Sequence, residues 1–172
     1  TNAVRLDPYS FSANLFMGLY LRGQNDPDKA LEFFGFAAEL EPLSPTPQLE
    51  IGQTWLVLAD LEETAEAFQK AIDLSPFDPQ LHLIMAEFSL QYDHYLETLG
   101  LEAAQEALRL DPESEAANLM MARILVALEQ PAEAQEFFQR AIHADPNNAE
   151  TYFHLGLFYL EAGFRTHAQD AL

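Results

Sequence analysis

The chain of 172 residues contains no cysteine, which excludes disulfides and thiolate metal sites. Basic residues are also scarce, because 8 lysines and arginines stand against 28 acids and leave a net charge of −20. An electrostatic field of this sign repels phosphate backbones and anionic lipid surfaces. We therefore expect no nucleic-acid partner, and we expect the charge to favour a basic protein partner.

Long apolar runs are missing as well. No stretch approaches the roughly 20 apolar residues that a membrane span needs, and no signal-peptide pattern is visible. The sequence therefore predicts no direct membrane insertion and a cytoplasmic location. Export or membrane anchoring of a longer polypeptide would change that location.

Motifs for catalysis and for metal binding are absent too. The sequence has no nucleophile motif, no glycine-rich phosphate loop and no His-Glu-x-x-His pair. Glu150 and His154 are four residues apart and share a helix face, but two ligands are too few for a zinc site, so we interpret them as a surface pair. His94, between Tyr92 and Tyr95, belongs either to a contact loop or to a spacer with aromatic packing. We expect no cofactor, no metal and no enzymatic activity.

Proline, by contrast, recurs at a nearly fixed spacing. The intervals between five of the prolines are 34, 34, 36 and 34 residues, and a period of this length predicts stacked structural units. Two residues after each proline stands a side chain that can cap a helix. The prolines are Pro8, Pro42, Pro76, Pro112 and Pro146, and the expected caps are Ser10, Ser44, Asp78, Ser114 and Asn148.

Within each period the apolar residues fall three and four apart, which predicts two antiparallel helices per unit. Small residues recur where the two helices would touch: Gly18, Gly52, Ala86, Ala122 and Gly156 in the first helix, and Ala37, Ala71, Ala107 and Ala141 in the second. We expect the recurring prolines to end each second helix. Pro45 and Pro79 should occupy first helical positions, as should Pro27 after Asp26, and Asp60 with Glu63 resembles a capping box.

This pattern resembles the tetratricopeptide repeat family, whose unit is a helix-turn-helix of 34 residues. The resemblance implies an all-α, right-handed superhelical solenoid built from antiparallel helix-turn-helix units. It predicts one array over residues 1–172, and its ends predict a piece of a longer array, with Phe164, Ala168 and Leu172 leaving an uncovered apolar face. The expected segments are the tail of a preceding repeat at 1–10, full repeats at 11–44, 45–78, 79–114 and 115–148, and a partial repeat at 149–172.

The sequence departs from the family pattern at two places. Where the family often has a bulky aromatic residue, only Tyr152 keeps it, and the other repeats have Asn14, Gln48, His82 and Asn118. The third repeat has two extra residues, which we expect in the turn at Tyr92–Tyr95. It also has Ala104 in place of Phe34, Phe68 and Phe138, so we expect an underfilled pocket that Ala104→Phe would fill.

The resemblance further implies that the first helices line a concave groove that binds an extended or helical peptide. Because only Arg22 and Arg123 are basic there, three repeats apart, a two-lysine clamp for a carboxylate is not expected. The mostly aliphatic set favours an amphipathic helix or an apolar peptide. The expected groove residues are Leu15, Leu19, Arg22, Leu49, Gln53, Leu56, Leu83, Glu87, Leu90, Leu119, Arg123, Val126, Phe153, Leu157 and Leu160.

Three further interpretations stay open at the level of the sequence. Flanking chain or a neighbouring copy could cover part of the apolar groove. The array could be a regulatory or substrate-recruiting arm of a larger enzyme, or it could be a self-assembly module whose repeat ends stack between copies. We expect a protein-interaction scaffold as the main function.

Overall fold

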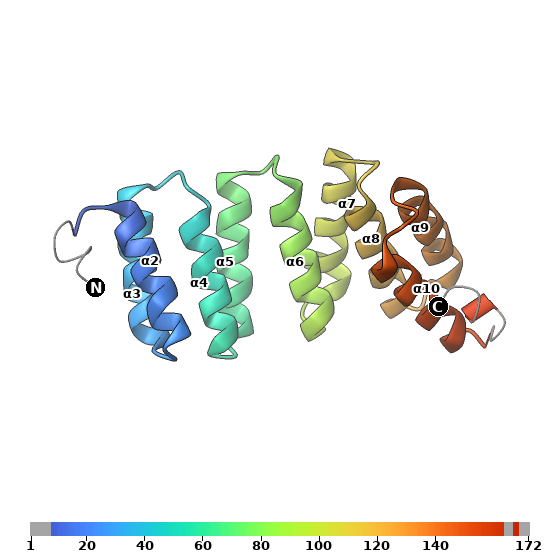
Figure 1. Cartoon of the computed structure of the whole chain (residues 1–172), viewed down its shortest axis with the longest axis horizontal. Coiled ribbons are helices and arrows are strands. Elements are labelled where there is room, and N and C mark those ends of the chain that lie inside the picture. The colour runs from blue at the N-terminus through green and yellow to red at the C-terminus, as the bar shows by residue number, and fades with distance from the viewer. Residues whose placement is uncertain (1–7, 164–166, 169–172) are drawn as a thin grey trace. The chain divides into compact units, whose positions relative to one another are not determined.

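A computed structural model describes residues 8–163, 167 and 168, and within those residues it contains helices and no strand (Figure 1). The predicted all-α class of helical hairpins is confirmed. The chain divides into two compact units, Thr1–Pro76 and Phe77–Leu172. The first unit contains α2 (Phe11–Gly23), α3 (Pro27–Leu40), α4 (Thr46–Val57) and α5 (Leu61–Leu74). The second contains α6 (Pro79–Tyr92), the π-helical turn η1 (Leu96–Gly100), α7 (Leu101–Leu110), α8 (Glu115–Ala127), α9 (Pro131–Ala144) and α10 (Ala149–Glu161).

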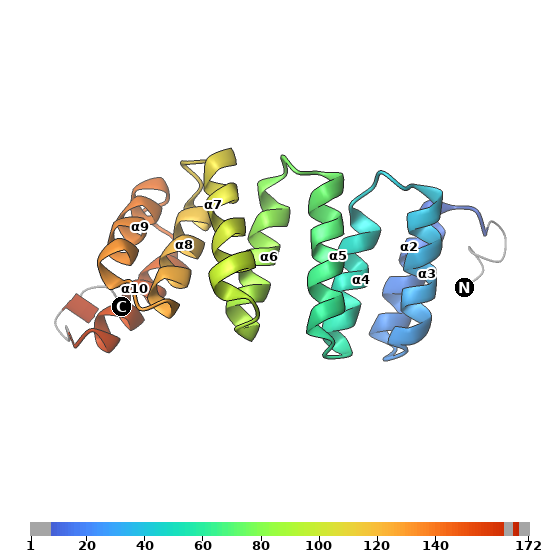
Figure 2. The ribbon, with the colours of Figure 1, turned by 180° about the vertical axis from the view of Figure 1, so that it is seen from behind.

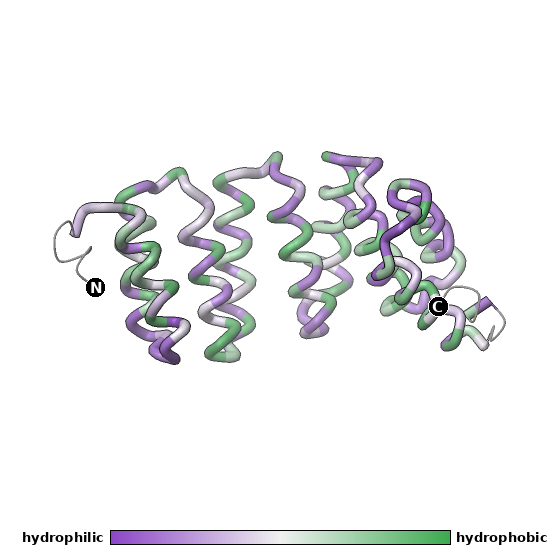
Figure 3. The backbone as a smooth tube through the Cα atoms, viewed as in Figure 1, coloured by the Kyte–Doolittle hydropathy of each residue, from purple (hydrophilic) through white to green (hydrophobic). Residues whose placement is uncertain are grey.

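The helices pair into hairpins, which both ribbon views show side by side within each unit (Figure 2). We number them hairpin 1 (α2–α3), hairpin 2 (α4–α5), hairpin 3 (α6 with η1 and α7) and hairpin 4 (α8–α9). Green apolar and purple polar positions alternate along the helices (Figure 3). This alternation is the expected pattern for helices that bury one face and expose the other.

Four of the five predicted caps start their helices. Ser10 accepts a hydrogen bond from the backbone N–H of Ala13 at 3.3 Å, and Ser114 accepts one from Ala117 at 3.3 Å. Asp78 and Asn148 likewise each accept a bond from the N–H two residues further on, at 3.0 and 2.8 Å. Each cap satisfies one of the N–H groups that a helix start leaves without a partner.

The predicted cap at Ser44 is wrong. Helix α4 begins at Thr46, and its N-cap residue is Pro45, which has helical backbone angles and no side-chain cap. A serine cap bonds the N–H two or three residues further on, and Pro47 has no N–H at the second of these positions. Pro45 is thus the N-cap residue and not the first helical residue, as had been expected, whereas Pro79 is the first residue of α6.

The recurring prolines end the second helices, as predicted. These helices end at Leu40, Leu74, Leu110 and Ala144, each two residues before such a proline. Within the hairpins, Asp60 caps α5 by accepting from the N–H of Glu63 at 3.2 Å. Asp26 precedes Pro27 at the start of α3, but its carboxylate pairs with Lys29 at 2.5 Å instead of capping the helix.

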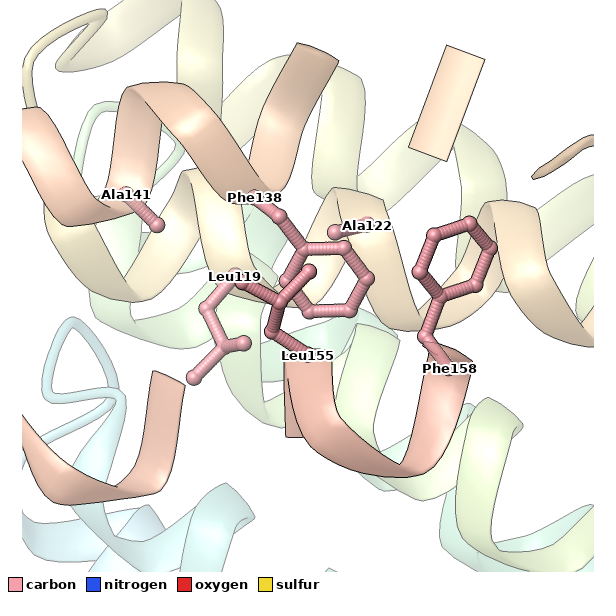
Figure 4. Packing of buried hydrophobic residues seen from close by; sticks show 6 residues of the cluster. All are labelled: Leu119, Ala122, Phe138, Ala141, Leu155 and Phe158. Carbon is pink, nitrogen blue, oxygen red and sulfur yellow. The ribbon is translucent and has the colours of Figure 1, made fainter. Parts of the chain in front are cut away.

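The two helices of a hairpin pack together where a small residue of one helix meets a large residue of the other. An added Cβ at Gly18 would lie 2.5 Å from the Phe34 ring, and one at Gly52 would lie 2.5 Å from the Phe68 ring. In the second unit, α8, α9 and α10 enclose a cluster of buried residues (Figure 4). The cluster comprises Leu119, Ala122, Phe138, Ala141, Leu155 and Phe158.

Two asparagines stand where the family often has an aromatic residue, and their side chains make hydrogen bonds to the backbone. Asn14 donates from its side-chain nitrogen to the carbonyls of Pro8 at 2.8 Å and Ser10 at 2.9 Å. Asn118 donates in the same way to Pro112 at 3.1 Å and Ser114 at 2.8 Å. Each asparagine therefore fastens the incoming turn to its own helix.

The two extra residues of hairpin 3 do not lengthen its turn, so that prediction is wrong. Three residues, 93–95, separate the two helices, as in the other hairpins. Helix α6 instead has 14 residues where α8 has 13, and the second helix opens with the five-residue turn η1. A π-helical turn absorbs an inserted residue inside a helix.

The predicted apolar face at the end of the chain falls mostly outside the described residues. Phe164 and Leu172 lie outside them, as does the segment 1–7 that was expected to be a helix tail. Ala168 is described and is 1% exposed. Its side chain is therefore covered rather than open.

Candidate functional site

First helices of successive hairpins are neighbours within each unit. Helix α2 packs against α4 in the first unit, and α6 packs against α8 and α8 against α10 in the second. The groove residues predicted from the sequence lie on these helices. Each unit therefore presents its own face of first helices.

In the second unit this face contains a hollow of about 280 Å³. It brings together four of the predicted residues: Leu83 and Glu87 from α6, and Leu119 and Arg123 from α8. The rest of its lining comes from α6, α8 and the start of α10. Those residues are Gln80, Ile84, Glu115, Ala116, Met120 and Glu150.

Leu83 and Leu119 are buried and form the floor of the hollow. Leu83 is 8% exposed and Leu119 is 5% exposed. Leu119 also packs in the cluster with Phe138 and Leu155 (Figure 4). These leucines therefore serve the core as well as the surface, and a ligand in the hollow would meet Ile84 beside them.

Arg123 is held by Glu87 across the two first helices. Its guanidinium donates to both carboxylate oxygens of Glu87, at 2.7 and 3.1 Å. Bidentate pairing of this kind fixes geometry as well as charge. The pair ties α8 to α6 at the edge of the hollow.

Arg22 has the same role in the first unit. It donates to the Glu50 carboxylate at 2.6 Å, to the Glu50 carbonyl at 3.0 Å, to Gln53 at 3.2 Å and to the Thr54 hydroxyl at 3.3 Å. Sequence reasoning identified Arg22 and Gln53 but missed Glu50 and Thr54. A basic and an acidic residue one repeat apart on first helices is the signal that could have found Glu50.

The remaining predicted residues divide by exposure. Phe153, Leu157 and Leu160 on α10 are 51%, 39% and 47% exposed and form a stripe at helical spacing. Gln53 is exposed as well. The others are partly buried: Leu15, Leu19, Leu49, Leu56, Leu90 and Val126.

Carboxylates surround the second-unit hollow. Glu115 accepts a hydrogen bond from the Thr151 hydroxyl, and Glu150 lies 3.9 Å from His154. Burial lowers the pKa of His154 below its ordinary value, and the positive charge of Arg123 lowers it further. His154 is therefore neutral near pH 7, and its contact with Glu150 is a weak surface pair, as the sequence predicted.

The turn of hairpin 3 packs its aromatic residues together. The His94 ring lies 4.2 Å from Tyr95 and 5.6 Å from Phe88, measured between ring centroids. A second hollow of about 620 Å³ lies between this turn and residues 127–129. Aromatic packing is therefore present here, and the contact-loop interpretation stays a prediction.

The part of the chain that the structure describes has neither a cluster of metal ligands nor a helix that could cross a membrane. Across residues 8–163, 167 and 168, no three histidine, aspartate or glutamate side chains are grouped so that they could hold a metal ion. Over the same residues, no helix has the length and apolar character that crossing a membrane requires.

Two stretches of the chain match models of known protein families. Residues 17–79 and 100–155 each match a model described as tetratricopeptide repeat. Together they cover more than half of the sequence and include α8, whereas residues 80–99, with nearly all of α6, lie between the two stretches.

Individual proteins are similar over most of this chain. Anaphase-promoting complex subunit 3 of Schizosaccharomyces pombe is 25% identical over 85% of this chain and 27% of its own length. Human protein O-mannosyl-transferase TMTC3 is 20% identical over 84% of this chain and 17% of its own length. The chain thus spans about a quarter or less of these relatives.

A solved structure shows the same fold. MamA from Desulfovibrio magneticus superposes with a TM-score of 0.75 at 19% identity, over 94% of this chain and 90% of that chain. At this level of identity the similarity concerns the fold of stacked helical hairpins.

Proposed function

Because the chain belongs to the tetratricopeptide repeat family, we propose that it is a non-catalytic scaffold that binds a protein segment on its first helices. The observation that carries this proposal is the hollow between α6 and α8. It has an aliphatic floor, and four of its lining residues coincide with positions at which the family resemblance implies peptide contacts. A recess of this kind suits one apolar side chain of a bound peptide.

The charges around the hollow support a partner that is amphipathic and basic. Glu87, Glu115 and Glu150 line it, and its one basic side chain, Arg123, is paired with Glu87. A lysine or arginine of the partner would lie near Glu115 and Glu150 while an apolar neighbour enters the hollow. Such a pattern is typical of an amphipathic helix in a groove.

The arginines do not support recognition of a free carboxylate. Arg22 and Arg123 each donate hydrogen bonds to a carboxylate of the neighbouring repeat. A ligand carboxylate would therefore compete with Glu50 or Glu87 for these guanidinium groups.

A second candidate function is a recruiting arm within a larger protein. This chain matches only 27% of the anaphase-promoting complex subunit and 17% of the mannosyl-transferase. The exposed α10 stripe of Phe153, Leu157 and Leu160 could contact another part of such a protein or a second copy. Self-association is tested directly by light scattering over a concentration series.

The experiment that tests the main proposal is a selection from displayed 20-residue peptides, followed by affinity measurement with each selected peptide. We expect the selected peptides to be amphipathic and basic. Ile84→Glu and Leu157→Glu place a charge on the binding face and should weaken binding at least about tenfold, because an apolar contact is replaced by a buried charge. Circular dichroism checks that both variants stay folded.

Phe77→Glu is the matched control, since Phe77 is in the same unit but lies in a turn and is 79% exposed. It should leave the affinity unchanged. Equal affinity of the wild type and both face variants would contradict the proposal and direct attention to another surface. Val126 is also a predicted groove residue, but it packs against the buried cluster. A charge at Val126 would therefore disturb the fold, so this position does not test binding.

A further inference from the structure

Hairpins 1 and 4 have hollows at the same repeat position, between the turn that enters the first helix and the second half of the second helix. The hollow of hairpin 1 measures about 470 Å³ and that of hairpin 4 about 720 Å³. Both include the recurring proline and the asparagine that fastens the turn, Pro8 with Asn14 and Pro112 with Asn118. The two hollows can therefore be compared position by position.

The hollow of hairpin 1 is lined by aromatic rings. Phe33 and Phe36 of α3 meet edge to face, with centroids 6.2 Å apart and planes at 74°. Tyr9 lines the same hollow, together with Leu40 and the carboxylate of Glu39. Tyr9 and Phe36 are 81% and 51% exposed, so both rings face solvent.

Hairpin 4 shows what covers an aromatic ring at this position. Phe137 and Phe33 both stand 25 residues after the recurring proline of their hairpins. The guanidinium of Arg140 lies over the Phe137 ring, 4.9 Å from its centroid. Arg140 stands at the position that Phe36 has in hairpin 1. Hairpin 1 therefore has the ring that corresponds to Phe137 but has no arginine to cover it.

The charge of hairpin 1 favours a cation in that place. Glu39 lines the hollow at the position that His143 has in hairpin 4, and Glu41 follows it in sequence. Two basic side chains of the hairpin, Arg22 and Lys29, are paired with Glu50 and Asp26. Aromatic faces beside a carboxylate attract a guanidinium, which is planar, stacks on rings and bonds a carboxylate in a bidentate manner.

From this juxtaposition we propose that the hollow of hairpin 1 is a binding site for an arginine side chain of a partner protein. The guanidinium stacks on Phe33 or Phe36 and pairs with Glu39, as Arg140 stacks on Phe137 within hairpin 4. The site lies where the turn into α2 meets α3, and it does not include the residues of the first-helix face. It therefore adds a second contact point for a basic partner and does not depend on the proposed groove.

The test is an NMR titration of the isotope-labelled 172-residue chain with N-acetyl-arginine amide. We expect saturable shifts of the backbone amides of Tyr9 and of residues 33–40. N-acetyl-citrulline amide is a neutral ligand of the same shape and should shift them far less. N-acetyl-lysine amide should bind more weakly than the arginine ligand, because an ammonium is not planar.

Two variants and a matched control locate the contact. Phe36→Ala and Glu39→Gln should each weaken binding about two- to fivefold, the range for one exposed cation–π or ion-pair contact. Asp73→Asn changes an exposed acid at the same repeat position of hairpin 2, where Lys70 replaces Phe36, and should leave binding unchanged.

Three results would overturn the proposal. The first is the absence of amide shifts around the hollow with the arginine ligand. The second is an equal response to the citrulline ligand. The third is a response that Phe36→Ala, Glu39→Gln and Asp73→Asn reduce alike, which would show general attraction to an acidic chain. None of these results would affect peptide binding at Ile84 and Leu157, so the two proposals fail independently.

Discussion

Gly18 lies against the ring of Phe34 so closely that a Cβ added to it would be 2.5 Å from the ring. Phe34 is completely buried and has no room to retreat. Gly18→Ala should therefore destabilise hairpin 1 by about 1–3 kcal/mol through overpacking. This cost outweighs the roughly 1 kcal/mol by which alanine is the better helix former. Urea unfolding followed by circular dichroism measures the change.

Gly35 provides the matched control within the same hairpin. It lies inside α3, and an added Cβ would meet nothing within 4 Å. Gly35→Ala should raise the free energy of unfolding by about 0.5–1 kcal/mol, since only the helix preference changes. If both variants changed stability in the same direction, the contact between Gly18 and Phe34 would not be the cause.

The Arg22 network should stabilise the stacking of α4 on α2. Arg22→Met removes hydrogen bonds to Glu50, Gln53 and Thr54 and leaves a partly buried carboxylate, so we expect a loss of about 1–3 kcal/mol. Arg109→Met breaks an exposed pair with Glu106 and should change stability little. Equal effects of the two substitutions in thermal unfolding would contradict a structural role for Arg22.

Ala104→Phe should destabilise hairpin 3, contrary to the expectation from the sequence. Ala104 is completely buried. One turn before Ala104, a Cβ added to Gly100 would lie 2.8 Å from that of Ser89, so the two helices are close. We expect a cost of about 1–3 kcal/mol. A raised melting temperature would instead support the underfilled pocket.

His154 should titrate below its ordinary pKa of 6.5, mainly because it is partly buried and secondarily because of Arg123. Since the folded chain then binds a proton less readily than the unfolded chain, stability should fall as the pH drops through 6.5. Arg123→Gln should raise the NMR titration midpoint of His154, because it removes a positive charge and frees the carboxylate of Glu87. An unchanged midpoint would leave burial as the sole cause.

Most of the fold follows from local rules that a sequence displays. The recurring prolines, the caps and the glycines opposite phenylalanines act over short distances or at a fixed period. The prediction of a cap at Ser44 was wrong because a cap also needs backbone N–H groups in the residues after it, and Pro47 has none. The extra residues of hairpin 3 were misplaced because a π-helical turn has no sequence signature as clear as proline or glycine.

The candidate site was only partly predictable. Family spacing identified Leu83, Glu87, Leu119 and Arg123 around the hollow, but it did not indicate which side chains also serve the core. Partners one repeat away, such as Glu50 for Arg22, depend on how neighbouring hairpins stack. The aromatic hollow of hairpin 1 was missed because Tyr9, Phe33 and Phe36 meet only after the chain has turned through a whole helix.

The most direct test of the proposed binding face is site-specific cross-linking to a selected peptide. A benzophenone side chain is placed at Gln80, which lines the hollow between α6 and α8, or at Gln139, which lines the hollow of hairpin 4 instead. We expect the peptide to be captured from Gln80 and not from Gln139. Capture from Gln139 alone, or equal capture from both positions, would contradict binding on the first helices.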